Sequence, residues 1–135
     1  MANADVLLAV RGVIDANLPA GLEVAPRYKG MTTWVVPESR SPKTRDGRPL
    51  PVLSLGERQS YVSLFVMAFH YVPGLRDWFD AAWLASGCPL RRGEVALQLR
   101  NLDDIAFDVL AELLERLTVD AAVKGYESTQ VAPRR

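Results

Sequence analysis

One apolar run, residues 59–69 (QSYVSLFVMAF), constrains the fold of this chain more than any other segment. It is rich in β-branched and aromatic residues, and turn-forming residues border it on both sides, which is typical of a β-strand. Apolar residues occupy both of its alternating faces, so both faces are expected to be covered by other parts of the protein. We therefore predict a central strand in the middle of a sheet.

Periodic patterns predict the other elements. Apolar residues recur at helical spacing in residues 3–18, in 73–87, where Gly87 follows the helix end, and in a third helix from Asn101 or Asp103 to about Leu117. A short helix is expected at 119–126. Strands are predicted at 30–37, 50–55 and 94–100. The short turn between 50–55 and the central strand predicts an antiparallel hairpin.

The order of these elements, α-β-β-β-α-β-α, predicts a two-layer α+β sandwich. Helices pack on one face of a mainly antiparallel sheet of about four strands in this architecture. A single domain is expected at residues 1–126, and the polar tail at 127–135 is expected to be disordered. The second face of the sheet is then open.

Charge and composition limit the partners of the chain. Its 135 residues include 16 lysines and arginines and 16 aspartates and glutamates, so no net field attracts nucleic acid or an anionic membrane. No segment approaches the roughly 18 apolar residues of a membrane span. The single cysteine, Cys88, excludes an internal disulfide and suits a reducing compartment. We expect a cytoplasmic protein that binds neither nucleic acid nor membrane.

Several motifs follow one another along the chain. They are residues 28–37 (YKGMTTWVVP), 49–51 (PLP), 59–64 (QSYVSL), 78–79 with 82–83 (WF and AW), 93–94 (GE) and 102–104 (LDD). In kind and order these motifs resemble the YdhG-like family, small bacterial proteins of unknown function, over roughly residues 6–126. The resemblance implies a compact α/β domain and, as for some relatives, a role as a frataxin-like intracellular iron chaperone. The chain departs from the family at Arg100 and Asn101, where relatives tend to carry lysines.

The open face of the predicted sheet is the first candidate site. Alternation that turns Leu97 and Leu99 toward the helices turns Gln98 and Arg100 outward. The candidate ligand-binding residues are Trp34, Tyr61, Ser63, Gln98 and Arg100. Guanidinium, phenol, hydroxyl and indole groups suit a small anionic or aromatic ligand, and Thr33 replaces Trp34 if the register differs. A protein partner, a homodimer interface and a covering loop at 39–49 are the alternatives, because apolar residues share this face.

An acidic series on the third predicted helix is the second candidate. Asp104, Asp108, Glu112 and Glu115 recur at i, i+4, i+8 and i+11. This spacing places the carboxylates on one side of a helix, and hard cations favour carboxylate oxygens. These residues are the metal ligands of the alternative function, an iron-binding chaperone. A solvated helix face explains the same pattern.

The residues typical of catalysis do not form a recognisable set. His70 is the only histidine, so a zinc site made of histidines is excluded and a Ser-His-Asp arrangement would depend on this residue alone. Cys88 follows a predicted helix C-terminus, where the helix dipole disfavours a thiolate. We predict a non-enzymatic binding protein with no cofactor, iron being the exception in the alternative function. Its partner is a small molecule or a protein.

Overall fold

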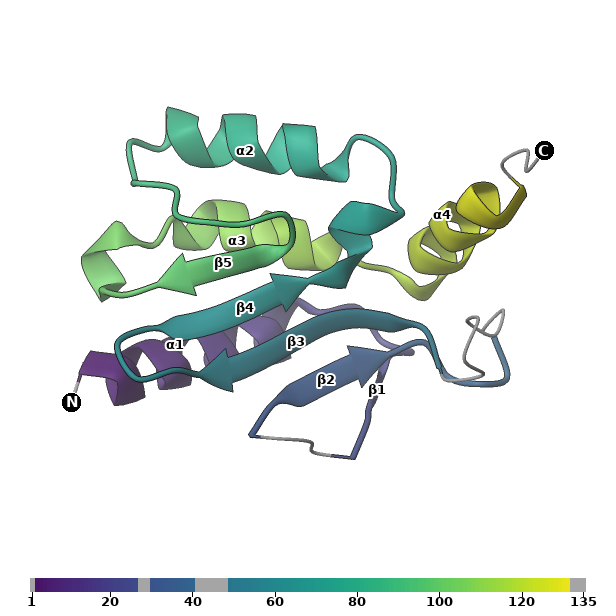
Figure 1. Cartoon of the computed structure of the whole chain (residues 1–135), viewed down its shortest axis with the longest axis horizontal. Coiled ribbons are helices and arrows are strands. Elements are labelled where there is room, and N and C mark those ends of the chain that lie inside the picture. Colours follow the sequence, from purple (N-terminus) through teal and green to yellow (C-terminus); the bar gives the residue numbers. More distant parts are fainter. Residues whose placement is uncertain (1, 27–29, 41–48, 132–135) are drawn as a thin grey trace.

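A computed structural model describes residues 2–26, 30–40 and 49–131 of the chain (Figure 1). The elements in these ranges are α1 (Ala2–Asn17), β1 (Glu23–Val24), β2 (Thr32–Val35), β3 (Pro51–Glu57), β4 (Val62–Val66), the 3₁₀ helix η1 (Met67–His70), α2 (Leu75–Ala85), β5 (Ala96–Leu99), the 3₁₀ helix η2 (Leu102–Asp104), α3 (Phe107–Glu115) and α4 (Val119–Val131). The predicted α+β class is confirmed. No helix in these ranges is long and apolar enough to cross a membrane.

The five strands form one antiparallel sheet in the order β1-β2-β3-β4-β5, so each strand pairs with its neighbour in the chain. The predicted hairpin is confirmed, because β3 and β4 pair from Leu53 opposite Val66 to Glu57 opposite Val62. The sheet has one strand more than the four predicted. The two residues of β1 pair with the end of β2, and a strand this short carries no periodic pattern.

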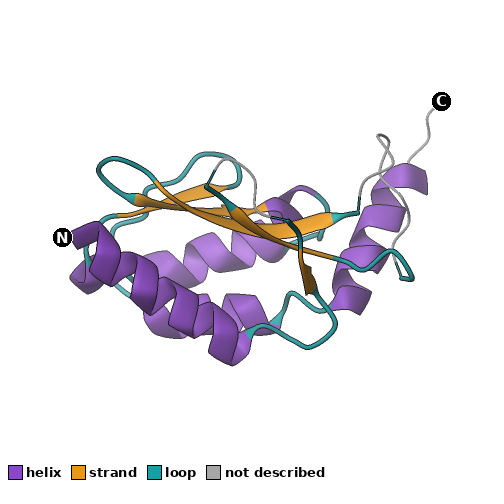
Figure 2. Ribbon diagram, turned by 90° about the horizontal axis from the view of Figure 1, so that it is seen from below, coloured by secondary structure: helices purple, strands orange, loops and turns teal. Residues whose placement is uncertain are grey.

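The helices α1, α2 and α3 lie on the same side of the sheet, and α4 stands at one end of it (Figure 2). The sheet face toward these helices is apolar: Leu53, Leu64 and Leu97 are at most 1 % exposed. Phe79 and Trp83 of α2 are also buried, with ring centres 5.3 Å apart. Each fully buried side chain of this kind contributes roughly 1.5–3 kcal/mol to folding. This face and the three helices form the core.

The central strand is shorter than predicted. After β4 the chain forms η1, and just beyond it the backbone N–H of Val72 donates to the backbone carbonyl oxygen of Ala68 at 2.8 Å. This turn carries Phe69 to Phe79 of α2, with ring centres 5.4 Å apart. The prediction of a strand over residues 59–69 is therefore wrong at its ends. Apolar composition does not distinguish a strand from a turn that buries its aromatic residue against a helix.

The third predicted helix is interrupted. A break follows η2, and α3 begins only at Phe107. Within the break Ile105 is extended (φ −104°, ψ 122°) and only 6 % exposed. Burial of this β-branched residue outweighs its weak tendency to continue a helix. The prediction of one helix capped at Asn101 or Asp103 is wrong.

The last helix, α4, docks beside Tyr71. Gly125 packs so closely there that a Cβ at this position would lie 2.6 Å from the Tyr71 carbonyl oxygen. The rings of Tyr71 and Tyr126 meet edge to face with their centres 5.9 Å apart. The Tyr71 hydroxyl donates to the Pro51 carbonyl oxygen at 2.8 Å, and burial raises the pKa of this phenol. The docking of α4 thus involves both backbone contact and ring packing.

The C-terminal ends of α2 and α4 test two further predictions. Gly87 has a φ of 87° one residue beyond the C-cap of α2, so the predicted C′ glycine is confirmed. Residues 127–131 continue α4, so the expectation that the tail is disordered from residue 127 is wrong there. The rest of that tail, 132–135, and most of the predicted loop, 41–48, lie outside the described residues.

Candidate functional site

The sheet face opposite the helices, here called the open face, consists of three rows of side chains that the strand register places side by side. The rows are Thr33, Ser54, Phe65 and Ala96; Gly56, Ser63 and Gln98; and, just past the strand ends, Arg58, Tyr61 and Arg100. No helix of the described ranges covers this face (Figure 2). Four of the five predicted ligand-binding residues, Tyr61, Ser63, Gln98 and Arg100, lie together on it.

Arg100 is held on the open face by two contacts. Its guanidinium carbon lies 5.1 Å from the centre of the Tyr61 ring. Its Nη2 donates to Oε1 of Gln98 at 3.1 Å. A cation over a ring contributes about 0.5–1 kcal/mol at an exposed site. The guanidinium has five N–H donors, so most of them stay available to an anion in a fixed orientation.

A second guanidinium lies on the same face. The Arg58 guanidinium carbon is 5.8 Å from the centre of the Phe65 ring, so this side chain crosses the row that contains Ser63. The sequence pattern did not indicate Arg58 as a site residue, because Arg58 lies in the predicted turn before the central strand. The backbone N–H of Arg58 donates to the backbone carbonyl oxygen of Tyr61 at 2.8 Å. This pairing across the hairpin places Arg58 on the open face.

Small residues form the centre of the open face. Gly56 lies opposite Ser63 across β3 and β4. The Met31 side chain fills the space above Gly56, because a Cβ at that position would overlap its sulfur. Ser63 is only 3 % exposed, yet its hydroxyl keeps a contact with solvent and has no hydrogen bond within the described residues. A buried hydroxyl without a protein partner is satisfied by water or by a ligand.

Ion pairing divides the arginines of the described ranges into two groups. Five of them have a carboxylate partner: Arg11, Arg40, Arg91, Arg92 and Arg116. The other three within these ranges, Arg58, Arg76 and Arg100, have none. Two of these three lie on the open face. The face therefore carries two guanidinium groups that form no ion pair with a described carboxylate, although the chain as a whole has a net charge of zero.

The predicted site residue Trp34 does not belong to this group. It pairs with Leu53 in the sheet, so it lies on the helix-covered face, and it is 4 % exposed. The guanidinium of Arg11 from α1 covers its ring at 5.3 Å. Assigning Trp34 to the ligand-binding face is wrong, and Thr33, the alternative in the other register, occupies the open face instead. Its hydroxyl lies 2.7 Å from that of Ser54.

The predicted acidic series does not form a single metal-binding surface. Asp104 belongs to η2, so it is not on the helix that carries Asp108, Glu112 and Glu115. Asp104 and Glu112 already pair with arginines, at N–O distances of 3.9 and 2.7 Å. Within the part of the chain that the structure describes, no three His, Cys, Asp or Glu side chains gather where they could hold a metal ion. The prediction that these four carboxylates share one side of a helix is wrong.

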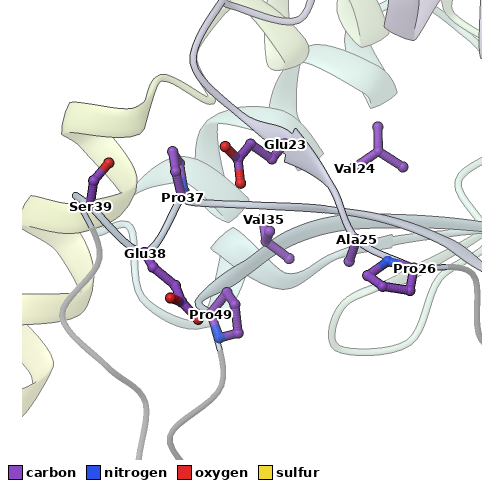
Figure 3. Close-up of a pocket in the computed structure, with 9 residues that line it drawn as sticks. All are labelled: Glu23, Val24, Ala25, Pro26, Val35, Pro37, Glu38, Ser39 and Pro49. Carbon is purple, nitrogen blue, oxygen red and sulfur yellow. The ribbon is translucent and has the colours of Figure 1, made fainter.

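A hollow of about 400 Å³ lies away from the open-face arginines, at the edge formed by β1 and β2 (Figure 3). Its charged side chains are Glu23 and Glu38, and Val35 and several prolines complete its lining. Two carboxylates make this hollow unfavourable for an anion. This hollow is therefore a poor site for an anionic ligand.

Comparison with known proteins adds no relative. No family model matches the chain, and no curated protein or solved structure matches it significantly. The YdhG-like resemblance therefore stays a prediction.

Proposed function

We propose that the chain is a binding protein whose open face takes a small anionic ligand at Arg58, Arg100, Gln98 and Ser63. One observation carries the proposal: two guanidinium groups, each stacked on a ring of the same face, have no carboxylate partner in the described ranges. A guanidinium held by a ring loses little freedom when it binds, and its paired N–H donors match a carboxylate or a phosphate. The free Cys88 thiol supports a cytoplasmic setting for this function.

A separate anion suits the open face better than a second copy of the chain. A two-fold interface brings a patch against itself, so Arg58 and Arg100 of one copy would approach the same residues of the other. Like charges that approach one another in a partly dehydrated interface repel strongly. The iron-binding alternative lacks comparable support, because two of its four carboxylates already have cationic partners. We therefore propose the anion site alone.

Isothermal titration calorimetry at low ionic strength tests this function, with sodium benzoate and inorganic phosphate as probes. The wild-type protein is expected to bind benzoate with a Kd on the order of 1 mM, because a few charge-assisted contacts on an accessible surface supply only a few kcal/mol. The double variant R58Q/R100Q removes both charges and retains side chains of similar length. We expect it to weaken the binding of both probes at least about tenfold.

The matched control is Arg116→Gln. Arg116 also lies over an aromatic ring, 3.9 Å from the centre of the Trp78 ring, but it belongs to the helix layer and already pairs with Glu112. This variant should leave the binding of both probes unchanged. Equal loss of binding in the control and the double variant would contradict the proposed site, as would full binding by the double variant.

A further inference from the structure

We infer that the ligand of the open face is an aromatic carboxylate, and that its ring replaces the Met31 side chain above Gly56. This inference rests on the proposed function, which specifies only an anion. It adds the chemical class of the ligand and the movement that admits it.

The centre of the open face has room for one ring once the side chains of Met31 and Arg58, which both pass over it, have moved. Gly56 has no side chain, and its neighbour Ser63 is small. Tyr61 and Phe65 flank Ser63 on the same strand face, four residues apart, which at ~3.3 Å per residue separates them by about 13 Å. A flat ring placed above Gly56, beside Ser63, would lie between the levels of these two aromatic residues along the strands. Aromatic rings favour such offset or edge contacts with one another.

Met31 is suited to act as a movable cover. It precedes β2, it is half-buried, and its sulfur occupies the space that a Cβ of Gly56 would need. A methionine side chain is unbranched and flexible, so it can leave this position at small cost. The site then binds a ring only when the Met31 side chain has moved aside, and the apparent affinity for an aromatic ligand is reduced to the fraction of time that the space is open.

The polar groups around the floor specify a carboxylate on the ring. Ser63 is only 3 % exposed, and its hydroxyl, which keeps a contact with solvent, has no hydrogen bond within the described residues, so it can donate to a ligand oxygen. Arg58 and Arg100 lie on the same face with unpaired charge. A benzoate-like molecule with its ring above Gly56 can place its carboxylate at the Ser63 hydroxyl and at one of the two guanidinium groups. Inorganic phosphate can accept from the hydroxyl and a guanidinium, but it has no ring to place above Gly56.

A methyl NMR titration of the wild-type protein, labelled with ¹³C at the methionine methyl groups, tests the displacement. Sodium benzoate should shift the Met31 methyl resonance, because the methyl group leaves its position and an aromatic ring arrives beside it. The shift should saturate with the same Kd that calorimetry gives. Cyclohexanecarboxylate should bind at least about threefold more weakly than benzoate, since it lacks ring stacking. Inorganic phosphate should leave the Met31 methyl resonance in place.

Two variants provide the second test. Met31→Ala removes the cover, and we expect it to tighten benzoate binding about threefold or more while phosphate binding stays the same. Met31→Leu retains the bulk and should not tighten benzoate binding. If Met31→Ala does not fold, the wild-type methyl titration and the leucine variant still decide the question.

The outcomes separate this inference from the function on which it rests. If benzoate binds and R58Q/R100Q abolishes binding, but the Met31 methyl resonance does not move or Met31→Ala binds no more tightly, the inference fails and the anion site stands. Equal binding of benzoate and cyclohexanecarboxylate overturns the aromatic class. If neither benzoate nor phosphate binds to the wild type or to Met31→Ala, the proposed function fails together with the inference.

Discussion

The Arg100 guanidinium carbon lies 5.1 Å from the centre of the Tyr61 ring, on the sheet face that no described helix covers. The same guanidinium donates to Gln98, and no described carboxylate pairs with it. Most other arginines of the described ranges do pair with carboxylates. Arg100 is therefore oriented by a neutral ring and a neutral amide, an arrangement that leaves its charge available to a ligand.

Arg100→Lys should weaken benzoate binding at least about threefold although the charge is retained. An ammonium group lacks the planar fork of N–H donors that matches a carboxylate, and it stacks less well on the Tyr61 ring. Arg91→Lys is the control, because Arg91 already pairs with Asp104. Calorimetric titration of both variants with benzoate is the measurement, and equal affinities of the two would contradict a bidentate role for Arg100.

Gly125→Ala should destabilise the protein by roughly 1–3 kcal/mol, against the usual preference of helices for alanine. The added Cβ would lie 2.6 Å from the Tyr71 carbonyl oxygen and would push α4 away from its docking position. Gly12→Ala in α1 is the matched control, since nothing lies within 4 Å of a Cβ there. It should stabilise the protein by about 0.5–1 kcal/mol. Urea unfolding of both variants measures the two effects, and changes of the same sign would show that α4 does not dock as described.

Tyr71→Phe should lower the free energy of unfolding by about 1 kcal/mol at neutral pH, because the hydrogen bond to the Pro51 oxygen is lost. Burial raises the pKa of Tyr71 in the folded protein above its unfolded value of about 10. The stability linked to the neutral phenol is therefore complete below about pH 10 and is lost as the pH rises further, since the unfolded state releases the proton first. The difference between wild type and variant should shrink near pH 11. Urea unfolding at both pH values tests this, and a difference that grows with pH would refute it.

Arg92→Gln should destabilise the fold by about 1–3 kcal/mol, because it leaves the partly buried Asp80 carboxylate without its partner. The Arg92 and Asp80 side chains are only 16 % and 23 % exposed, and Arg92 also donates to the Gly93 oxygen at 2.8 Å. The ion pair of Arg40 with Asp120 is far more exposed, so Arg40→Gln should change stability by less than about 1 kcal/mol. Thermal unfolding of the two variants provides the comparison. An equal shift in Tm for the two variants would mean that burial does not determine how much these ion pairs contribute to stability.

The sequence predicted those parts of the fold that depend on regular alternation. Leu97 and Leu99 are separated by Gln98, and this pattern places the leucines in the core and the glutamine on the open face. Prediction from the sequence failed where tertiary packing outweighs the local preference of a segment for helix or strand. Ile105 interrupts a helical pattern because the core buries it in an extended conformation. Phe69 leaves the sheet because α2 offers it a ring to pack against.

The sequence predicted those parts of the candidate site that depend only on which residues of a strand share one face. Tyr61 and Ser63 share a face with Gln98 and Arg100 because β4 and β5 pair directly. Trp34 was misplaced because an isolated strand sequence does not specify which face meets the helices. Arg58 was missed because its role depends on pairing across the hairpin. The cover formed by Met31 over Gly56 depends on contact between different strands, which a linear pattern does not contain.

The most direct test of the anion site is a two-dimensional ¹H–¹⁵N NMR titration of the wild-type protein with benzoate. We predict that the side-chain amide of Gln98 and the backbone amide of Ser63 shift together and saturate with one Kd, while the amides of Glu23 and Glu38 at the distant hollow stay in place. Shifts concentrated at Glu23 and Glu38, or the absence of saturable shifts at Gln98 and Ser63, would contradict the account.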